Sequence, residues 1–487
     1  MKKKTWYFLL LIITLLMSIN IIIPLNDFFA DLSLINDAYH VLQKKYVEPD
    51  KLEDKKITYE AIRGMVKTLD EHTVFMDPEQ KKIFFSDLEG SFGGVGIQID
   101  KRDNYIVVVS AIEGTPAYQK GIRAGDKIVE VDGESVVGIS IDGIMRKLRG
   151  EIGTEVKIGI MREGVEEIID FNIKRAKIEI PSVTAHFMLN DDTGYIRLSQ
   201  FNETAFDQTL ESLKELESKG MKKIVFDLRD NPGGLLEMAY KISNLFIENG
   251  KSIVSTKGRD NKLLEEKIAD SNTPFKDVEI AVLINDGTAS ASEIFSGAIK
   301  DLKRGILIGQ KSYGKGSVQK IYPLSDESSI KVTVAYYFTP SGKCVDKKGI
   351  EPDYEVVKKE MSYQMLELVK RDYFSKFAEK YHKNYEIGEN FEINPNPYPD
   401  FINFLEKESN FDFKDNFIKD EHIRELLANN VENWKNLMLT KIKKELSQRL
   451  NYKLITLIKN EMEGRKYLSQ NDRYIDKAES ILAGGKE

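Results

Sequence analysis

The chain has little cysteine and little histidine. Cys344 is its single cysteine, so an intramolecular disulfide and a cysteine-based zinc site are both excluded. No two of the five histidines stand at metal-ligand spacing; they are His40, His72, His186, His382 and His422. We therefore predict no metal site and no cofactor. A catalytic mechanism in this chain has little imidazole to draw on.

A basic surface stripe is also missing. The 71 Lys and Arg residues are interspersed with 78 Asp and Glu residues, and the formal net charge is −7. Nucleic-acid-binding surfaces need a concentration of positive charge, so we predict no nucleic-acid partner. The 487 residues exceed one ordinary hydrophobic core, which predicts a chain of two to four domains.

The N-terminus carries the longest apolar run. Three lysines, Lys2 to Lys4, precede an apolar stretch from Trp6 to about Leu25. About 20 apolar residues are enough to cross a bilayer, and the lysines favour a cytoplasmic N-terminus. A signal peptide cleaved near Ala30 is the competing interpretation. We favour an uncleaved signal anchor over residues 1–26. Both interpretations place the remaining chain outside the cytoplasm, in a periplasm or at the cell exterior.

Four further segments differ in their residue patterns. Residues 27–89 show an amphipathic helical pattern. The apolar face of such a helix usually packs against a partner element, and a homodimer contact is one option. Residues 90–176 show short strands between glycine turns, and residues 177–357 alternate strands with helices, which is typical of an α/β sheet. Residues 358–487 are helical and charged, with a Pro-rich break over 394–399. The fold class is therefore multidomain α+β.

The strands and helices expected in the middle of the chain have definite positions. Strands are predicted at 105–110, 127–131, 156–161, 194–198, 224–228, 280–284 and 305–309. Helices are predicted at 204–219, 235–248 and 291–303, and a long core-facing helical pattern runs from Ile423 to Leu454.

Ser290 is the candidate nucleophile. A buried strand over 280–284 runs through a glycine turn into a helix that begins among small residues. A serine at such a corner is exposed, and nearby helix N–H groups stabilise developing negative charge. Taken alone, Ser290 and Ser292 are better explained as small helix-capping residues.

Lys315 is the candidate general base. The segment Gly309–Gln319 resembles a phosphate-binding loop, but residue 316 is Gly where Ser or Thr should hold magnesium, and a strand rather than a helix follows. Flanking glycines allow burial of Lys315, and burial favours the neutral amine. A neutral lysine can activate a serine. Gln319 shares a strand face with Lys315, where its amide oxygen can orient the amine.

A second glycine turn follows the strand at 224–228. Gly233 and Gly234 precede a helix, so their backbone N–H groups can form part of an oxyanion hole. The alternative is a plain strand–helix turn.

These motifs together resemble one family, the carboxyl-terminal (tail-specific) processing proteases. The resemblance covers roughly residues 30–355 and fades beyond about residue 360. It rests on Leu69–Thr73, Phe92–Ile97, Asp227–Gly234, Thr288–Glu293 and Tyr313–Gly316 with Gln319. It implies a crotonase-like α/β serine protease core with Ser290 as nucleophile, Lys315 as base and Gln319 as the residue that orients the lysine. It also implies oxyanion donors near Gly233 or Gly234 and at Ala291.

The resemblance further implies that residues 90–176 form a PDZ domain that reads substrates. The glycine-rich run offers consecutive backbone donors for a terminal carboxylate, and the next strand can pair with an extended peptide. Arg149 resembles a position that couples substrate binding to activation. The peptide-binding residues are then Phe92, Gly93, Gly94, Val95, Gly96, Ile97 and Arg149.

The sequence therefore predicts a serine endopeptidase that recognises protein C-termini and cleaves extracytoplasmic proteins near them. Its partners are peptides or proteins with apolar C-termini, a membrane through the N-terminal anchor, a second copy of the chain, and a regulatory partner protein if activity is switched. Two alternatives are a PDZ scaffold with an inactive protease core, and a crotonase-like acyl-CoA enzyme. The second has little use for an export signal or a peptide-binding domain.

Overall fold

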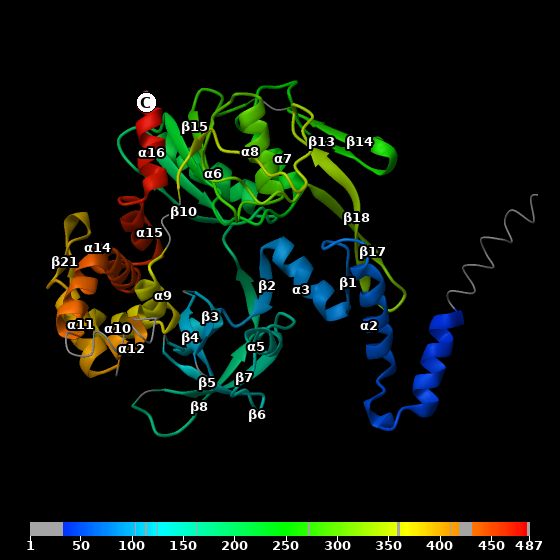
Figure 1. The fold of residues 1–487 in the computed structure, drawn as a ribbon, viewed down its shortest axis with the longest axis horizontal. Coiled ribbons are helices and arrows are strands. Elements are labelled where there is room, and N and C mark those ends of the chain that lie inside the picture. The colour runs from blue at the N-terminus through cyan, green and yellow to red at the C-terminus, as the bar shows by residue number, and fades with distance from the viewer. Residues whose placement is uncertain are drawn as a thin grey trace, which may run out of the picture. The chain divides into compact units, whose positions relative to one another are not determined.

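The computed structural model describes residues 33–484 except 103, 113, 124, 163, 271–272, 358–360, 410 and 418–430. The predicted anchor over residues 1–26 lies outside these residues. In the described ranges, no helix combines the length and the apolar character needed to cross a bilayer. The chain divides into two compact units (Figure 1). The first holds the residues up to Asp77 and Ile321–Val332, and the second holds Pro78–Lys320 and Thr333 onward.

The first unit is built from helices and a short strand pair. Residues 33–45 are helical and keep their apolar side chains exposed, as with Leu34 at 70%. The helix α2 spans Asp54–Lys67 after a short 3₁₀ turn, η1 (Pro49–Lys51), and β1 (Val74–Met76) pairs antiparallel with the start of β18 (Ser329–Phe338). The predicted helical character of this segment is thus present.

The second unit contains a six-stranded sheet in the order β10-β11-β12-β15-β16-β19. All neighbours are parallel except β10 and β11, which are antiparallel. The strands are β10 (Val183–Met188), β11 (Thr193–Leu198), β12 (Lys223–Asp227), β15 (Glu279–Ile284), β16 (Ile306–Gly309) and β19 (Tyr354–Glu355). The helices against it are α6 (Ala205–Ser218), α7 (Leu236–Asn244), α8 (Ala291–Asp301) and α16 (Arg473–Leu482). The predicted strands and helices of this region are confirmed to within a few residues.

Each central strand is apolar at successive positions because both faces of the sheet are covered. Ile224 and Phe226 of β12 join the core beneath α6, α7 and α8, whereas Val225 between them joins a second core with Ile475 of α16. Side chains alternate across a strand, so a sheet with two covered faces needs a continuous apolar run. The C-terminal helix α16 is therefore an integral layer of this sheet.

A second sheet adjoins these helices. In the second unit, Tyr336–Phe338 at the end of β18 pair antiparallel with β13, which also pairs with β14. The other elements of this sheet region are β13 (Ser252–Lys257), η2 (Arg259–Asn261), β14 (Leu263–Ile268) and β17 (Ser317–Pro323). Strand β17 pairs with β18, and its residues from Ile321 on belong to the first unit.

Residues 91–179 form a strand-rich domain with its own core. Its sheet has the order β3-β4-β5-β7-β8, which leaves β3 at an edge. The strands are β3 (Ile97–Arg102), β4 (Tyr105–Ala111), β5 (Lys127–Val131), β6 (Glu134–Ser135), β7 (Glu155–Met161) and β8 (Ile169–Lys174), with helices α4 (Pro116–Lys120) and α5 (Ile141–Leu148). The strands predicted here are confirmed. Helix α3 (Pro78–Glu89) leads into a two-stranded stem of β2 (Ser91–Gly94) and β9 (Ala176–Glu179).

The C-terminal region, residues 361–484, is mainly helical, as predicted. Its core is rich in phenylalanine, with Phe377 and Phe401 fully buried, and Leu446, Leu450 and Leu454 of the long helix pack into it. The start of that predicted helix, at Ile423 and Leu427, lies outside the described residues. The elements are α9 (Tyr363–Lys370), α10 (Tyr373–Tyr381), η3 (His382–Asn384), β20 (Glu386–Ile387), η4 (Glu389–Phe391), β21 (Ile393–Asn394), α11 (Tyr398–Lys407), α12 (Phe413–Phe417), α14 (Val431–Ile458), α15 (Glu461–Ser469) and α16.

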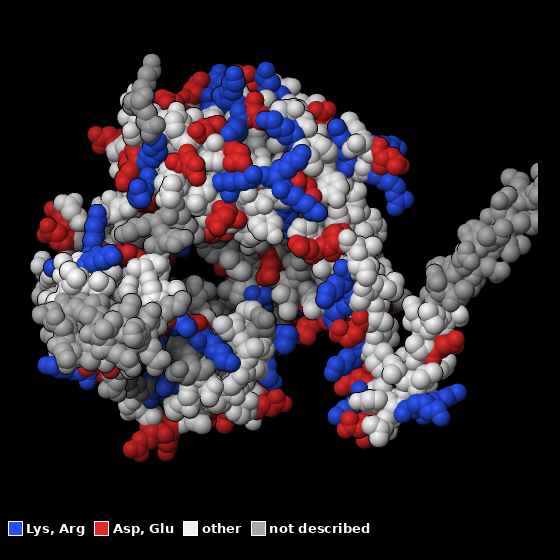
Figure 2. Space-filling model, viewed as in Figure 1, with Lys and Arg blue, Asp and Glu red and all other residues white. Residues whose placement is uncertain are grey.

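The surface carries both signs of charge. On the face shown in Figure 2, acidic and basic side chains are interspersed over the helices and strands. This mixture follows from the similar numbers of the two kinds of residue, 78 acidic and 71 basic.

Candidate active site

Ser290 lies at the corner between β15 and α8. Its backbone has φ 56° and ψ −119°, and its side chain is half-buried. A residue with a Cβ adopts such angles only at a cost of about 1–3 kcal/mol, which the surrounding structure must offset. The turn before it is anchored by Thr288, whose hydroxyl donates to the Leu228 carbonyl at 2.8 Å. A strained serine that follows a strand and opens a helix is typical of an exposed nucleophile.

Glu293 joins the Ser290 corner to the Lys315 loop. One oxygen of its carboxylate accepts hydrogen bonds from the backbone N–H groups of Ser290 at 2.8 Å and Lys315 at 2.9 Å. The other oxygen accepts from the Ser312 hydroxyl at 2.6 Å and the Gly314 N–H at 2.7 Å. Glu293 is fully buried. A single carboxylate therefore fixes the backbone of both candidate catalytic residues.

Tyr337 closes the same cluster from β18. Its hydroxyl donates to the Lys315 carbonyl at 2.7 Å and lies 3.1 Å from the Ser290 carbonyl oxygen. Burial raises the pKa of the Tyr337 hydroxyl, and the nearby Glu293 carboxylate raises it further. The phenol therefore stays protonated and serves as a donor.

Lys315 lies in an environment that favours its neutral form. Burial lowers the pKa of its ammonium group, and the Glu293 carboxylate opposes this shift only in part. Burial also raises the pKa of the Glu293 carboxyl, against the hydrogen bonds that it accepts from Ser312 and Gly314. The effect of burial is the larger one, so Lys315 loses its proton more easily than a lysine in water.

Gln319 lies on β17 beyond Lys315. Its amide Nε2 donates to the Ser317 hydroxyl at 2.8 Å and lies 3.5 Å from the Thr333 hydroxyl. Within the part of the chain that the structure describes, no hydrogen bond joins the Lys315 amine to Gln319 or to the Ser290 hydroxyl. The backbone of the site is thus assembled, and the roles of the Ser290, Lys315 and Gln319 side chains stay a prediction.

Gly233 lies directly against the Ser290 corner. A Cβ added to Gly233 would lie 2.6 Å from Ser290 Cβ and 2.8 Å from the Ala291 nitrogen. The Gly233 N–H donates to the Asn231 side chain at 2.9 Å. Among the described residues, the N–H groups of Gly234 and Ala291 donate to no acceptor. The Gly233 N–H is therefore already used within its own turn, and the oxyanion donors near Gly233 or Gly234 and at Ala291 stay a prediction.

Comparison with known proteins agrees with this geometry. The profile of Peptidase family S41 matches residues 192–356, and a PDZ domain profile matches residues 107–162. A carboxy-terminal-processing protease of Bartonella bacilliformis is 39% identical over 336 residues, which span 67% of this chain and 75% of that protein.

The chain belongs to peptidase family S41.

The S41 assignment makes the chain a serine-type peptidase with a PDZ domain, and the predicted resemblance to carboxyl-terminal processing proteases is confirmed. The carboxy-terminal processing protease CtpA of Bacillus subtilis is 36% identical over 360 residues, 74% of each chain. Among solved structures, a photosystem II D1 C-terminal processing protease is 29% identical, with a TM-score of 0.41 over 66% of this chain and 92% of that one.

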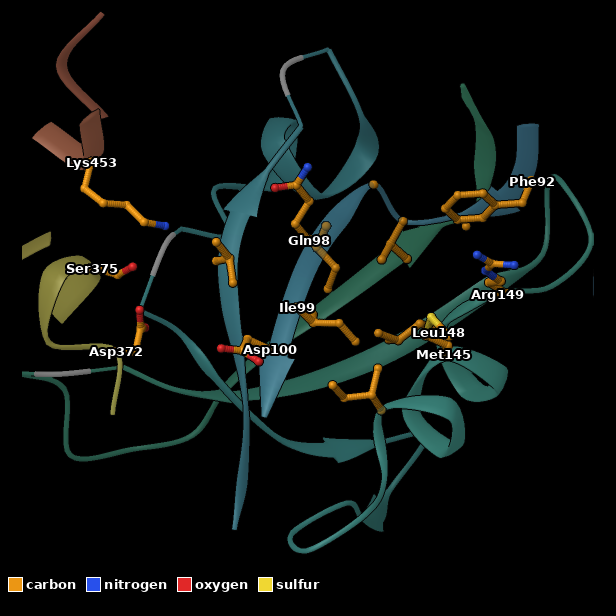
Figure 3. Close-up of a pocket in the computed structure, with 16 residues that line it drawn as sticks. Phe92, Gln98, Ile99, Asp100, Met145, Leu148, Arg149, Asp372, Ser375 and Lys453 are labelled. Carbon is orange, nitrogen blue, oxygen red and sulfur yellow. The ribbon is translucent and has the colours of Figure 1, made fainter. Parts of the chain in front are cut away.

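The PDZ domain of this S41 peptidase has a cavity of about 540 Å³ between β3 and α5, which we call the groove (Figure 3). Arg149 at one end lies 4.2 Å over the Phe92 ring and forms an ion pair with Asp87 at 3.3 Å. Gly93 packs against the Gly150 carbonyl instead of lining the groove. The other predicted peptide-binding residues all line it: Phe92, Gly94, Val95, Gly96, Ile97 and Arg149.

Three residues of the S41 site were not assigned a role from sequence. Glu293 had a readable signal, because Ser290 and Glu293 have the Ser-x-x-Glu spacing of a capping box. Asn231 bridges the two loops, accepting from the Ala289 N–H at 3.0 Å and the Ser292 hydroxyl at 3.1 Å through its carbonyl. Asn231 lies in the Asp227–Gly234 motif, but neither that motif nor any pattern around Tyr337 predicts these contacts, which depend on packing.

Proposed function

We propose that this S41 peptidase is a Ser-Lys endopeptidase that recognises protein C-termini through its PDZ groove and cleaves extracytoplasmic proteins near those termini. Ser290 is the nucleophile and Lys315 the general base, and Gln319 orients the amine. The names of the curated relatives, carboxy-terminal processing proteases, support this substrate class.

One observation carries the proposal. Glu293 holds the backbone of Ser290 and the backbone of Lys315 on a single oxygen, although the two residues are 25 positions apart in sequence. Burial lowers the pKa of the Lys315 amine at this position. A lysine held beside a strained serine, in a buried setting, matches the needs of nucleophile activation.

The reaction follows from these groups. The neutral Lys315 amine accepts the Ser290 hydroxyl proton as the oxygen attacks the scissile carbonyl carbon. The N–H groups of Gly234 and Ala291 donate to the carbonyl oxygen as it becomes negative. The Lys315 ammonium then protonates the leaving amine, and water hydrolyses the acyl-enzyme by the same relay.

Substitution of the pair tests the proposal. Ser290→Ala and Lys315→Ala should each abolish cleavage of an unfolded substrate with an apolar C-terminus. Lys315→Arg should abolish cleavage as well, because arginine cannot give up its proton. Lys311→Ala is the matched control, since Lys311 lies in the same loop with an exposed ion pair to Glu351. Full activity in Lys315→Ala protein would refute the proposed base.

An inactive scaffold is the second candidate. It is disfavoured because Ser290, Lys315 and Gln319 are all present, and because the strained φ of Ser290 has a cost that a mere scaffold has no need to bear. A scaffold would bind C-terminal peptides without any serine-dependent cleavage, which the same assay detects.

The proposal also includes the setting of the enzyme. Residues 1–26 anchor the chain in a membrane with the peptidase outside the cytoplasm, and the exposed apolar side chains of residues 33–45 pair with a second copy of the chain. A regulatory partner protein is a further component if activity is switched. Protease protection in spheroplasts tests the orientation, and light scattering of detergent-solubilised protein tests the dimer.

A further inference from the structure

The PDZ groove has a second wall that does not belong to the PDZ domain. One end is formed by the glycine-rich run and Arg149, and the opposite end is formed by Asp372, Ser375 and Lys453 of the C-terminal region. Figure 3 shows these three side chains at the end of the groove opposite Phe92 and Arg149. Ser375 belongs to α10 and Lys453 to α14, so two helices contribute.

The groove is open along the strand that a peptide would join. β3 is the edge strand of its sheet and pairs with β4 on its other side. A peptide whose terminal carboxylate lies at Gly94–Ile97 would extend antiparallel to β3 toward Asp100. At about 3.3 Å per residue, the level of Asp100 is reached about three residues before the terminal residue.

Lys453 supplies the positive charge at this end of the groove, whose lining also includes Asp100. Its side chain is half-buried, and within the described residues it forms no ion pair. The two carboxylates at this end have other interactions. Asp372 interacts with the guanidinium of Arg449 on α14, and Asp100 accepts from the Lys101 N–H at 2.8 Å.

We infer that Lys453 is a specificity-determining residue that favours substrates with an acidic side chain about three residues before the C-terminal residue. A carboxylate there completes an ion pair with a partly desolvated ammonium, whereas a lysine in the ligand meets like charge. The inference rests on the proposed reading of protein C-termini by the groove and adds a contact from the C-terminal region to it.

Peptide binding tests this directly. Full-length Ser290→Ala protein in detergent is titrated into fluorescein-labelled ten-residue peptides that share an apolar C-terminal residue and carry Glu, Ala or Lys at the fourth position from the end. We expect the Glu peptide to bind roughly fivefold more tightly than the Ala peptide, and the Lys peptide to bind more weakly than both. Lys453→Glu should reverse the order, and Lys453→Gln should remove it.

The control variant is Lys441→Glu, an exposed lysine of α14 that does not line the groove and should leave the order unchanged. Equal binding of the three peptides, or an unchanged order in Lys453→Glu protein with a normal melting temperature, would overturn the inference. A peptide with an amidated C-terminus tests the proposed function separately from the role of Lys453. If the amidated peptide binds as well as the free acid, the proposal that the groove recognises the terminal carboxylate is refuted, whatever the effect of Lys453.

Discussion

Asp472 holds Arg229 through a hydrogen bond from Nη1 to Oδ1 at 3.1 Å and an ion-pair contact between Nη2 and Oδ2 at 2.8 Å, across 243 residues of sequence. The same guanidinium donates to the buried Asp227 and lies 4.8 Å over the Tyr474 ring. Arg229 begins the loop that carries Gly233 and Gly234. The last helix of the chain therefore supports the loop that faces the candidate nucleophile.

Removal of the Asp472 charge should weaken this loop. Asp472→Asn should lower the free energy of unfolding by roughly 1.5–3 kcal/mol, the usual range for hydrogen bonds to charged groups. Peptidase activity should fall as well, since the loop loses its outer support. Urea unfolding and peptide cleavage measure the two effects. Arg473→Gln, a change in the adjacent exposed residue, is the control, and equal behaviour of both variants would contradict the role of Asp472.

The close approach of Gly233 to Ser290 predicts a strong effect of one methyl group. Gly233→Ala places a Cβ 2.6 Å from Ser290 Cβ and should abolish activity by displacing the nucleophile. Gly250→Ala is a matched control, because both glycines have positive φ (97° and 84°) and no atom lies within 4 Å of a Cβ at Gly250. Both variants share the backbone strain, so a loss of cleavage in both would attribute the effect to strain alone.

The pH profile should report the Lys315 amine. Burial lowers the pKa of Lys315 below its ordinary value of 10.5, so kcat/KM should rise with pH and level off as the ammonium loses its proton. The Glu293 carboxylate raises that pKa. Glu293→Gln should therefore move the rising limb to lower pH, while kcat falls because the backbone cluster has lost a charged acceptor. A limb that stays in place, or moves to higher pH, would show that another group titrates.

The buried Asp227 carboxylate should make the free energy of unfolding depend on pH. Burial alone would raise the pKa of its carboxyl, but the Arg229 and Arg197 guanidiniums outweigh burial and hold the pKa well below its usual range. A depressed carboxyl pKa adds stability above the unfolded-state value of about 4, and that stability is lost as the pH falls through the folded-state value.

Asp227→Asn should therefore cost about 3–5 kcal/mol at pH 7, and the difference from the parent protein should shrink at pH 3. Urea unfolding at both pH values gives the comparison. Asp191→Asn, at an exposed aspartate, should change stability at neither pH. A cost for Asp227→Asn that is the same at pH 7 and pH 3 would mean that its charge is not the stabilising factor.

Much of the site was predictable because its signals are local. A strand with a continuous apolar run, such as Ile280–Ile284, must be buried on both faces of its sheet. The run predicts this burial without showing which helices pack on each face. The neighbouring residues predict the positions of Ser290 and Gly233. Ser290 follows a strand and a glycine turn, and Gly233 precedes a helix, so both lie at turns that the local sequence identifies. The order of these motifs along the chain was enough to predict the protein family.

Other features depended on contacts between distant parts of the chain. The sequence by itself determined the strands, the turns and the candidate pair Ser290 and Lys315, because side-chain period and turn chemistry act over a few residues. Only the tertiary structure decided that Glu293 binds both of their backbones, that Asp472 supports Arg229, and that Lys453 reaches the PDZ groove. Packing of whole helices brings these groups together, and no short pattern encodes which distant polar groups will meet.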